Sequence, residues 1–157
     1  MDIFFIGILI LVLAGILQLF VKNQNWKLNI ISVSSVLSAI LVVYNSIKIF
    51  FDGGYVRYFN FSSVFNQNLA FALDNISAFF AIIISVMSTL AIIYSKGYLK
   101  PYIEKGKGIS AHCLFLMLLT ASMLGVVSCQ NALMFLIIWE IMSLSSFFLV
   151  IFEHEKK

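Results

Sequence analysis

The chain has 157 residues, of which 62% are hydrophobic and 11% are charged, and its mean hydropathy is +1.04. A soluble domain carries charge on about one quarter of its residues, so this composition excludes a soluble fold and predicts an integral membrane protein. The net charge of +3 comes mainly from lysines between apolar segments, and no basic stripe with interleaved aromatic residues indicates a nucleic-acid partner.

The first half of the chain contains two predicted membrane helices. The N-terminus lacks a basic region and carries Asp2, so the first apolar segment is expected to stay in the membrane rather than be cleaved. The first span covers residues 3–21 and the second residues 28–50, and Trp26 in the polar turn between them is an expected interfacial anchor. The serines of the second span suit close helix packing.

A longer connection, residues 51–73, follows the second span. It opens with Asp52-Gly53-Gly54, which is a strong turn signal. The aromatic stretch Tyr55–Phe65 has little helical or alternating period, so we expect an interfacial segment. Asp74 is placed to cap the next helix.

Three more spans complete a single predicted membrane domain, residues 1–157, without an internal repeat or linker. They cover residues 76–94, 110–128 and 132–152. A loop over residues 95–109 contains four lysines and Pro101, and Gln130-Asn131 forms a tight turn. The predicted fold class is therefore all-α and polytopic, with about five transmembrane helices.

The distribution of Lys and Arg predicts the orientation. One side carries Lys48 and Arg57, and the other carries eight lysines: Lys22, Lys27, Lys96, Lys100, Lys105, Lys107, Lys156 and Lys157. Basic residues are retained in the cytoplasm. We therefore expect the N-terminus outside and the C-terminus in the cytoplasm, in the inner (cytoplasmic) membrane.

Glu140 is the most informative residue, because it is the only charged residue between Ala132 and Phe152. At about 1.5 Å per residue it lies about 12 Å from one end of that span and about 18 Å from the other, too deep for its short side chain to reach the headgroups. An ionisable group at that depth costs on the order of 3 kcal/mol. The position of Glu140 therefore predicts that this residue has a function.

Two interpretations of Glu140 stay open. It is either a neutral, hydrogen-bonded acid with Ser143 one turn away as a local partner, or a proton-relay carboxyl. Hydrocarbon favours the neutral form and a nearby cation favours the ionised form. The sequence offers no Lys, Arg or His at the same depth, so a basic partner is expected from elsewhere.

The remaining polar residues have weaker indications. His112 and His154 are most simply interfacial, and Asp74 is most simply a helix cap, although each is a possible accessory group. Cys113 and Cys129 are about 24 Å apart along one helix, which excludes a disulfide between them. No Cys or His spacing indicates a metal, and we expect no cofactor.

Three strings in the second half resemble a known family: Leu73-Asp74-Asn75-Ile76-Ser77-Ala78-Phe79-Phe80, Tyr94-Ser95-Lys96-Gly97-Tyr98-Leu99, and Asn131 to Ser146 with Trp139-Glu140-Ile141-Met142-Ser143. They look like the antiporter-like, proton-translocating subunits of complex I, membrane-bound hydrogenases and multisubunit cation/proton antiporters. The string Phe152 to Lys156 looks most like hydrogenase-4 component B or formate hydrogenlyase subunit 3. The resemblance covers residues 70–157.

The resemblance implies that Glu140 matches a fifth-helix glutamate thought to exchange charge with a buried lysine on a later helix. Family members usually have about fourteen helices, so the lysine-bearing helix is expected on a separate chain, or this chain is a truncated or split product. Asn75 stands where the family often has Gly or Pro. Gln130 stands where an Asp is common.

The leading functional hypothesis is the N-terminal part of a proton-translocating subunit in a redox-driven complex, of the NADH dehydrogenase or hydrogenase type. Such a subunit is not itself catalytic, and its partners are membrane lipid and other membrane subunits. One alternative is a subunit of a multisubunit cation/proton antiporter. The other is a non-transporting scaffold or truncated fragment.

Overall fold

The computed structural model describes residues 3–52, 55–61, 67–104, 106 and 108–154, with the side chains of all but residues 55–61, 67–69 and 152–154. Five α-helices make up most of this part: α1 Ile3–Leu17, α2 Gln24–Asp52, α3 Asn75–Glu104, α4 Ser110–Ser128 and α5 Ala132–His154. A short 3-10 helix, η1 (Gln18–Phe20), extends α1. With that extension, all five are long and apolar enough to cross a membrane. The prediction of an all-α, multi-pass membrane protein is confirmed.

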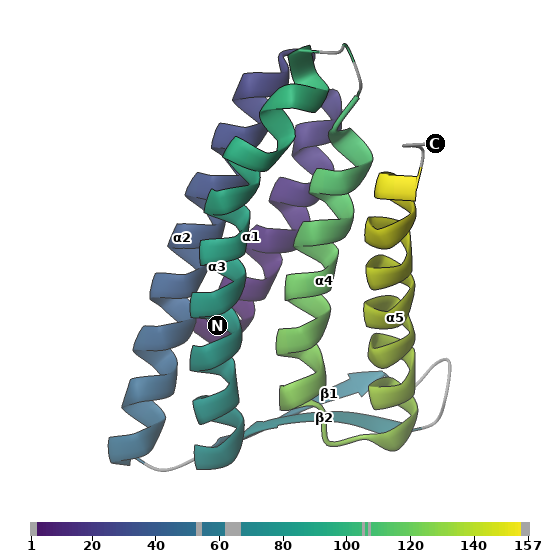
Figure 1. The fold of residues 1–157 in the computed structure, drawn as a ribbon. Coiled ribbons are helices and arrows are strands. Elements are labelled where there is room, and N and C mark those ends of the chain that lie inside the picture. The colour runs from purple at the N-terminus through teal and green to yellow at the C-terminus, as the bar shows by residue number, and fades with distance from the viewer. Residues whose placement is uncertain (1–2, 53–54, 62–66, 105, 107, 155–157) are drawn as a thin grey trace.

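Helices α1 to α4 form a ring in which each helix packs against the next and α4 packs against α1. Helix α5 stands outside this ring and packs chiefly against α4 (Figure 1). In α5 only a small part of the surface is therefore covered by the rest of the chain, and only 6% of its apolar window is buried, against 39% for α4.

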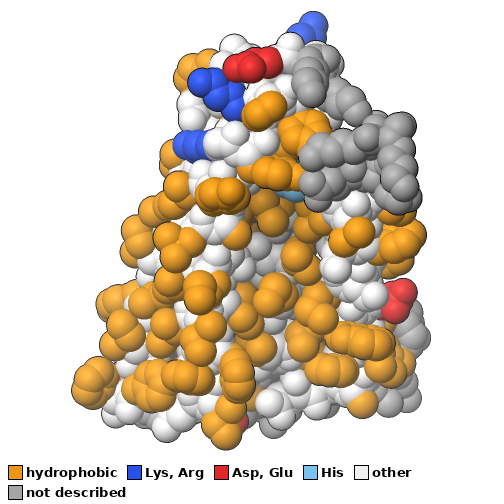
Figure 2. Space-filling view, in the orientation of Figure 1, with side chains coloured by type: hydrophobic (Ala, Val, Ile, Leu, Met, Phe, Trp, Pro, Cys, Tyr) orange, Lys and Arg blue, Asp and Glu red, His pale blue; other side chains and the backbone are white. Residues whose placement is uncertain are grey.

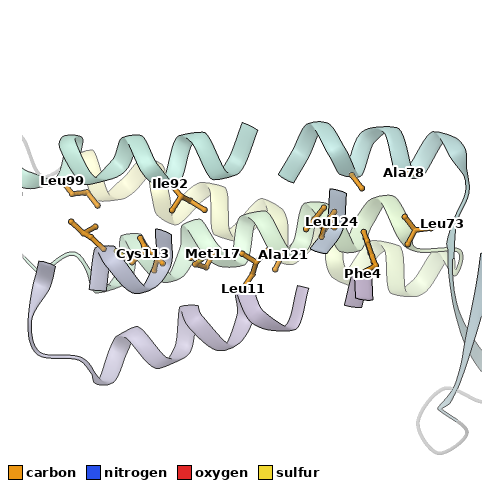
Figure 3. Packing of buried hydrophobic residues seen from close by; sticks show 14 of the residues in the cluster. Phe4, Leu11, Leu73, Ala78, Ile92, Leu99, Cys113, Met117, Ala121 and Leu124 are labelled. Carbon is orange, nitrogen blue, oxygen red and sulfur yellow. The ribbon is translucent and has the colours of Figure 1, made fainter. Parts of the chain in front are cut away.

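The core of the ring is made by side chains that recur at helical spacing. Figure 3 shows four of them on α4, namely Cys113, Met117, Ala121 and Leu124. Intervals of three and four residues place side chains on one face of a helix. Phe4 and Leu11 of α1 belong to the same core cluster and pack from the side of α1.

Helices α1 and α2 approach closely through small residues. Ser38 donates a hydrogen bond from its hydroxyl to the carbonyl of Gly7 at 2.8 Å. A Cβ atom on Gly7 would lie 2.9 Å from a methyl group of Val42. Small residues bring helix backbones together in this way within membranes.

The connection between α2 and α3 is a β-hairpin rather than a segment without regular structure. Strands β1 (Tyr55–Phe61) and β2 (Gln67–Leu73) pair antiparallel, with Tyr55 opposite Leu73. The strand was not predicted because aromatic residues at successive positions remove the alternation of apolar and polar residues. Aromatic and β-branched residues nevertheless favour strands. The hairpin lies across one end of the bundle below α4 and α5 (Figure 1).

The turn between α4 and α5 is attached to this hairpin. The amide of Gln130 donates a hydrogen bond to the carbonyl of Ala70 at 2.9 Å. Phe71 and Cys129 form an isolated antiparallel bridge. These contacts hold the turn between α4 and α5 against strand β2.

The third helix differs most from its predicted bounds, because it ends at Glu104, ten residues after Tyr94. Lysines are good helix formers, so Lys96 and Lys100 continue the helix beyond its apolar part. Pro101 lies inside the last turns. We call this end of the bundle, formed by residues 18–27, 96–104 and 108–112, the lysine-rich end. The opposite end is the hairpin end. Figure 2 shows basic side chains at the former and hydrophobic side chains over most of the remaining visible face.

Candidate functional site

Glu140 lies on the side of α5 that faces away from the other helices. The side of α5 that meets α4 is marked by Ser145, which is 2% exposed, and by Ile138, which lies 3.1 Å from the position of a Cβ on Gly125 of α4. At 100° per residue, Glu140 is more than 130° around the helix from both. Its side chain is exposed in this chain.

The surroundings of Glu140 are apolar and uncovered. Leu136, Leu144 and Phe147, which share its face of the helix, are 58%, 47% and 56% exposed. Within the described part of the chain, Glu140 makes no hydrogen bond and no ion pair. We call this outward face of α5, centred on Glu140, the Glu140 face.

The predicted local partner, Ser143, is also exposed on α5. No hydrogen bond joins its hydroxyl to Glu140 in the structure. Ser143 therefore does not pair with Glu140 among the described residues.

Asp74 caps α3, as the sequence predicts. Its carboxylate accepts a hydrogen bond from the amide of Ser77 at 2.7 Å. The hydrogen bonds from the Ser77 amide and hydroxyl hold the pKa of Asp74 below its ordinary value. The residue lies before the first turn of α3, at the hairpin end, and no contact joins it to Glu140 in the described structure.

The two histidines lie far from Glu140 along the bundle. His112 is in the first turn of α4 at the lysine-rich end, where its ring lies 6.5 Å from that of Tyr98. His154 is the last residue of α5, about 21 Å from Glu140 at helical rise, and its side chain is outside the described part. The structure does not bring these accessory candidates to Glu140.

Lys27 is a buried cation in α2, although its charge suggested a place in the polar turn before that helix. The side chain is 5% exposed, and its ammonium donates a hydrogen bond to the hydroxyl of Ser110. A helical interval of four residues relates Lys27 to Ile31, which is fully buried. That spacing is the feature of the sequence that could have predicted the burial of Lys27.

Gln18 closes the polar cluster around Lys27. It is fully buried, and its amide nitrogen donates to the carbonyls of Ser110 at 2.9 Å and Gly15 at 3.1 Å. Its amide oxygen has no hydrogen-bond partner among the described residues. Lys27, Ser110 and Gln18 lie at the lysine-rich end, whereas Glu140 is nearer the hairpin end, so the structure does not bring Lys27 to Glu140.

Among the described residues, no group of three or more His, Cys, Asp and Glu side chains is arranged to hold a metal ion. Cys113 is buried in α4, Cys129 lies in the turn before α5, and neither is in a disulfide. Burial raises the pKa of the Cys129 thiol, which makes it less nucleophilic.

Five spans with a hairpin at one end define a multi-pass membrane protein, and Glu140 lies near the middle of the fifth span. Residues 58–106 match the family described as NADH-Ubiquinone oxidoreductase (complex I), chain 5 N-terminus. The match covers about one third of the chain, from β1 to the end of α3. It supports the resemblance to antiporter-like subunits. None of the curated proteins compared matches this chain.

The matched segment contains two of the three strings that carried the resemblance, and the third, around Glu140, lies outside it. The match therefore bears on the antiporter-like family and not on the hydrogenase-4 branch or the role of Glu140. Proteins of this kind work with other membrane subunits in a complex, so membrane partners are expected for this chain.

Proposed function

We propose that this chain is part of a proton-translocating membrane subunit in which Glu140 is a relay carboxyl. The observation that carries the proposal is the position of Glu140 at the centre of an apolar, uncovered helix face. A carboxyl there is costly in lipid, and it has no partner among the described residues. Another membrane segment with a basic side chain at the same depth would cover the Glu140 face and offset this cost.

The relay would follow from the two environments available to the carboxyl. Against hydrocarbon alone, the neutral, protonated form is favoured. When a Lys, Arg or His cation comes close, the carboxylate is favoured and the proton leaves. Movement of the base toward and away from Glu140 would then release and reload one proton, without any covalent chemistry at this chain.

The redox-driven complex, of the NADH dehydrogenase or hydrogenase type, is the version we favour. The support is the match to a complex I chain over residues 58–106. Electron transfer would take place in partner subunits, and this chain would bind no cofactor. The basic side chain that faces Glu140 would come from another membrane segment.

The orientation of the chain in the membrane follows from the distribution of its basic residues. Lys22, Lys96 and Lys100 lie at the lysine-rich end, and the helix that carries Lys48 ends at the hairpin end. Basic residues are retained in the cytoplasm. The lysine-rich end would therefore face the cytoplasm, and the hairpin end would lie at the opposite, outer surface of the inner membrane. A cysteine introduced at Lys22, in a variant without Cys113 and Cys129, should react with an impermeant maleimide only from the cytoplasmic side.

The relay is tested by Glu140→Gln in the assembled complex. The variant should assemble at normal levels and lose coupled proton transport, because the amide cannot release a proton. Glu104→Gln, at the exposed end of α3, is the matched control and should transport normally. Normal transport by Glu140→Gln in intact membranes would refute the relay.

A cation/proton antiporter subunit is the alternative with the same use of Glu140. Proton uptake driven by a sodium or potassium gradient, without an electron donor, would favour it over a redox complex. The scaffold alternative predicts instead that an assembled complex with Glu140→Leu retains full transport.

A further inference from the structure

A furrow of about 500 Å³ runs along the outside of the bundle between α1 and α2. It is lined by one face of α2 between Trp26 and Leu37 and by one face of α1 between Ile10 and Leu17. Along α2 it extends about 16 Å at helical rise. The small side chains of Ala14 and Ser34 leave room between the larger residues on both sides, so the furrow can take an extended hydrocarbon chain.

The furrow reaches a group of polar side chains at the lysine-rich end. Asn29 lines it there, and the ammonium of Lys96 donates a hydrogen bond to the Asn29 side chain at 3.2 Å. Lys22 is exposed in the connection between α1 and α2. Trp26, which is 63% exposed, lines the same end of the furrow and is of the type found at membrane interfaces. Neither lysine is in an ion pair with any described residue.

We propose that this furrow binds an anionic glycerophospholipid, with one acyl chain along α1 and α2 and the headgroup phosphate between Lys22 and Lys96. The charge distribution selects this occupant. A transmembrane helix would meet apolar residues along the whole furrow and would leave both ammonium groups without a counterion. A lipid with an apolar tail and a net negative headgroup matches both parts, whereas phosphatidylcholine matches only the tail.

Tryptophan fluorescence tests the proposal, because Trp26 is at the mouth of the furrow and the other tryptophan, Trp139, is on α5. In a Trp139→Phe background, the full chain is placed in phosphatidylcholine vesicles containing increasing fractions of brominated phosphatidylglycerol or brominated phosphatidylcholine. Phosphatidylglycerol should quench Trp26 at lower mole fractions. Lys96→Gln should lower its relative binding constant about fivefold, the effect expected of one basic residue at an anionic membrane surface.

Two controls separate the furrow from general surface charge. Lys48→Gln, at the other end of α2, should leave the relative binding constant unchanged. Ser34→Phe should fill the furrow and remove the preference for phosphatidylglycerol, whereas Ile40→Phe, on an exposed part of α2 outside the furrow, should keep it. Circular dichroism confirms that each variant is folded.

Equal quenching by the two brominated lipids would overturn the proposal. So would an equal loss in the Lys48→Gln and Lys96→Gln variants, which would indicate nonspecific attraction. Quenching by neither lipid would show that protein rather than lipid covers Trp26, and it too would overturn the proposal.

Discussion

The ammonium of Lys27 donates a hydrogen bond to the hydroxyl of Ser110 and so joins the first turn of α2 to the start of α4. Removing the hydroxyl in Ser110→Ala leaves a buried cation without this acceptor. The loss of a partner from a buried polar group costs about 1–3 kcal/mol, and more for a charged one. We expect Ser110→Ala to lower the thermal unfolding temperature of the chain in detergent.

A comparison with Lys27→Met shows whether the buried charge of Lys27 causes the lower unfolding temperature of Ser110→Ala. Methionine has a similar length and no charge, and replacing a buried ion by an apolar side chain is often neutral. We therefore expect Lys27→Met to unfold at a higher temperature than Ser110→Ala. Both variants lack the hydrogen bond, so the opposite order would mean that the buried ammonium does not destabilise the bundle when the Ser110 hydroxyl is absent.

The stability of α3 should depend on pH through the carboxyl of Asp74. The folded-state pKa lies below the ordinary value of 3.8. Its stabilising effect is thus complete above that value and is lost as the pH falls through the lowered folded-state pKa. Thermal unfolding measured between neutral pH and about pH 3 should show this loss in the wild type. Asp74→Asn keeps an acceptor for the cap and should remove the contribution of this residue to the acid loss.

Asp74→Ala removes the cap itself. It should cost about 1 kcal/mol at neutral pH. If the alanine and asparagine variants were equally stable at that pH, the cap would not stabilise α3.

Gly7 should not tolerate a side chain, because a Cβ atom would lie 2.9 Å from Val42 and 3.3 Å from the Ser38 carbonyl. Overpacking of this kind costs about 1–3 kcal/mol, so Gly7→Ala should lower the unfolding temperature, and adding Val42→Ala should restore part of it. Gly97 in α3 is the control, since a Cβ there meets nothing within 4 Å. Gly97→Ala should be neutral or stabilising, by up to about 1 kcal/mol. Equal destabilisation at both positions would contradict the packing argument.

Glu140 should contribute nothing to the folding of this chain by itself, since it contacts no described polar group. Glu140→Leu should leave the unfolding temperature in detergent unchanged. In a translocon insertion assay of the α5 segment, it should improve insertion by on the order of 2–3 kcal/mol. A large loss of stability would reveal an internal partner for the carboxyl.

The sequence was sufficient to predict the spans, because length and hydropathy decide whether a helix can cross a bilayer. The same reasoning failed beyond the apolar part of α3, where Lys96 and Lys100 look like loop residues but extend the helix. It also missed the hairpin, because strand pairing between Tyr55 and Leu73 depends on a partner distant in sequence. Hydropathy carries no information on such pairing.

The position of Glu140 near the middle of the fifth span also followed from sequence, but the direction of its side chain did not. That direction depends on which face of α5 packs on α4, and the contact between Ile138 and Gly125 sets it. Lys27 shows the opposite case. Its charge suggested a loop, although its spacing from Ile31 placed it on the buried face of α2.

The hydrogen bond from Ser38 to Gly7 uses only residues near the start of the chain. Both partners have been synthesised once α2 enters the membrane, and nothing later in the sequence is needed to complete the contact. Helices that are individually stable in a bilayer associate through such close packing. The first two helices can therefore associate while the ribosome is still translating α3, and they then provide a preformed surface on which the later helices assemble.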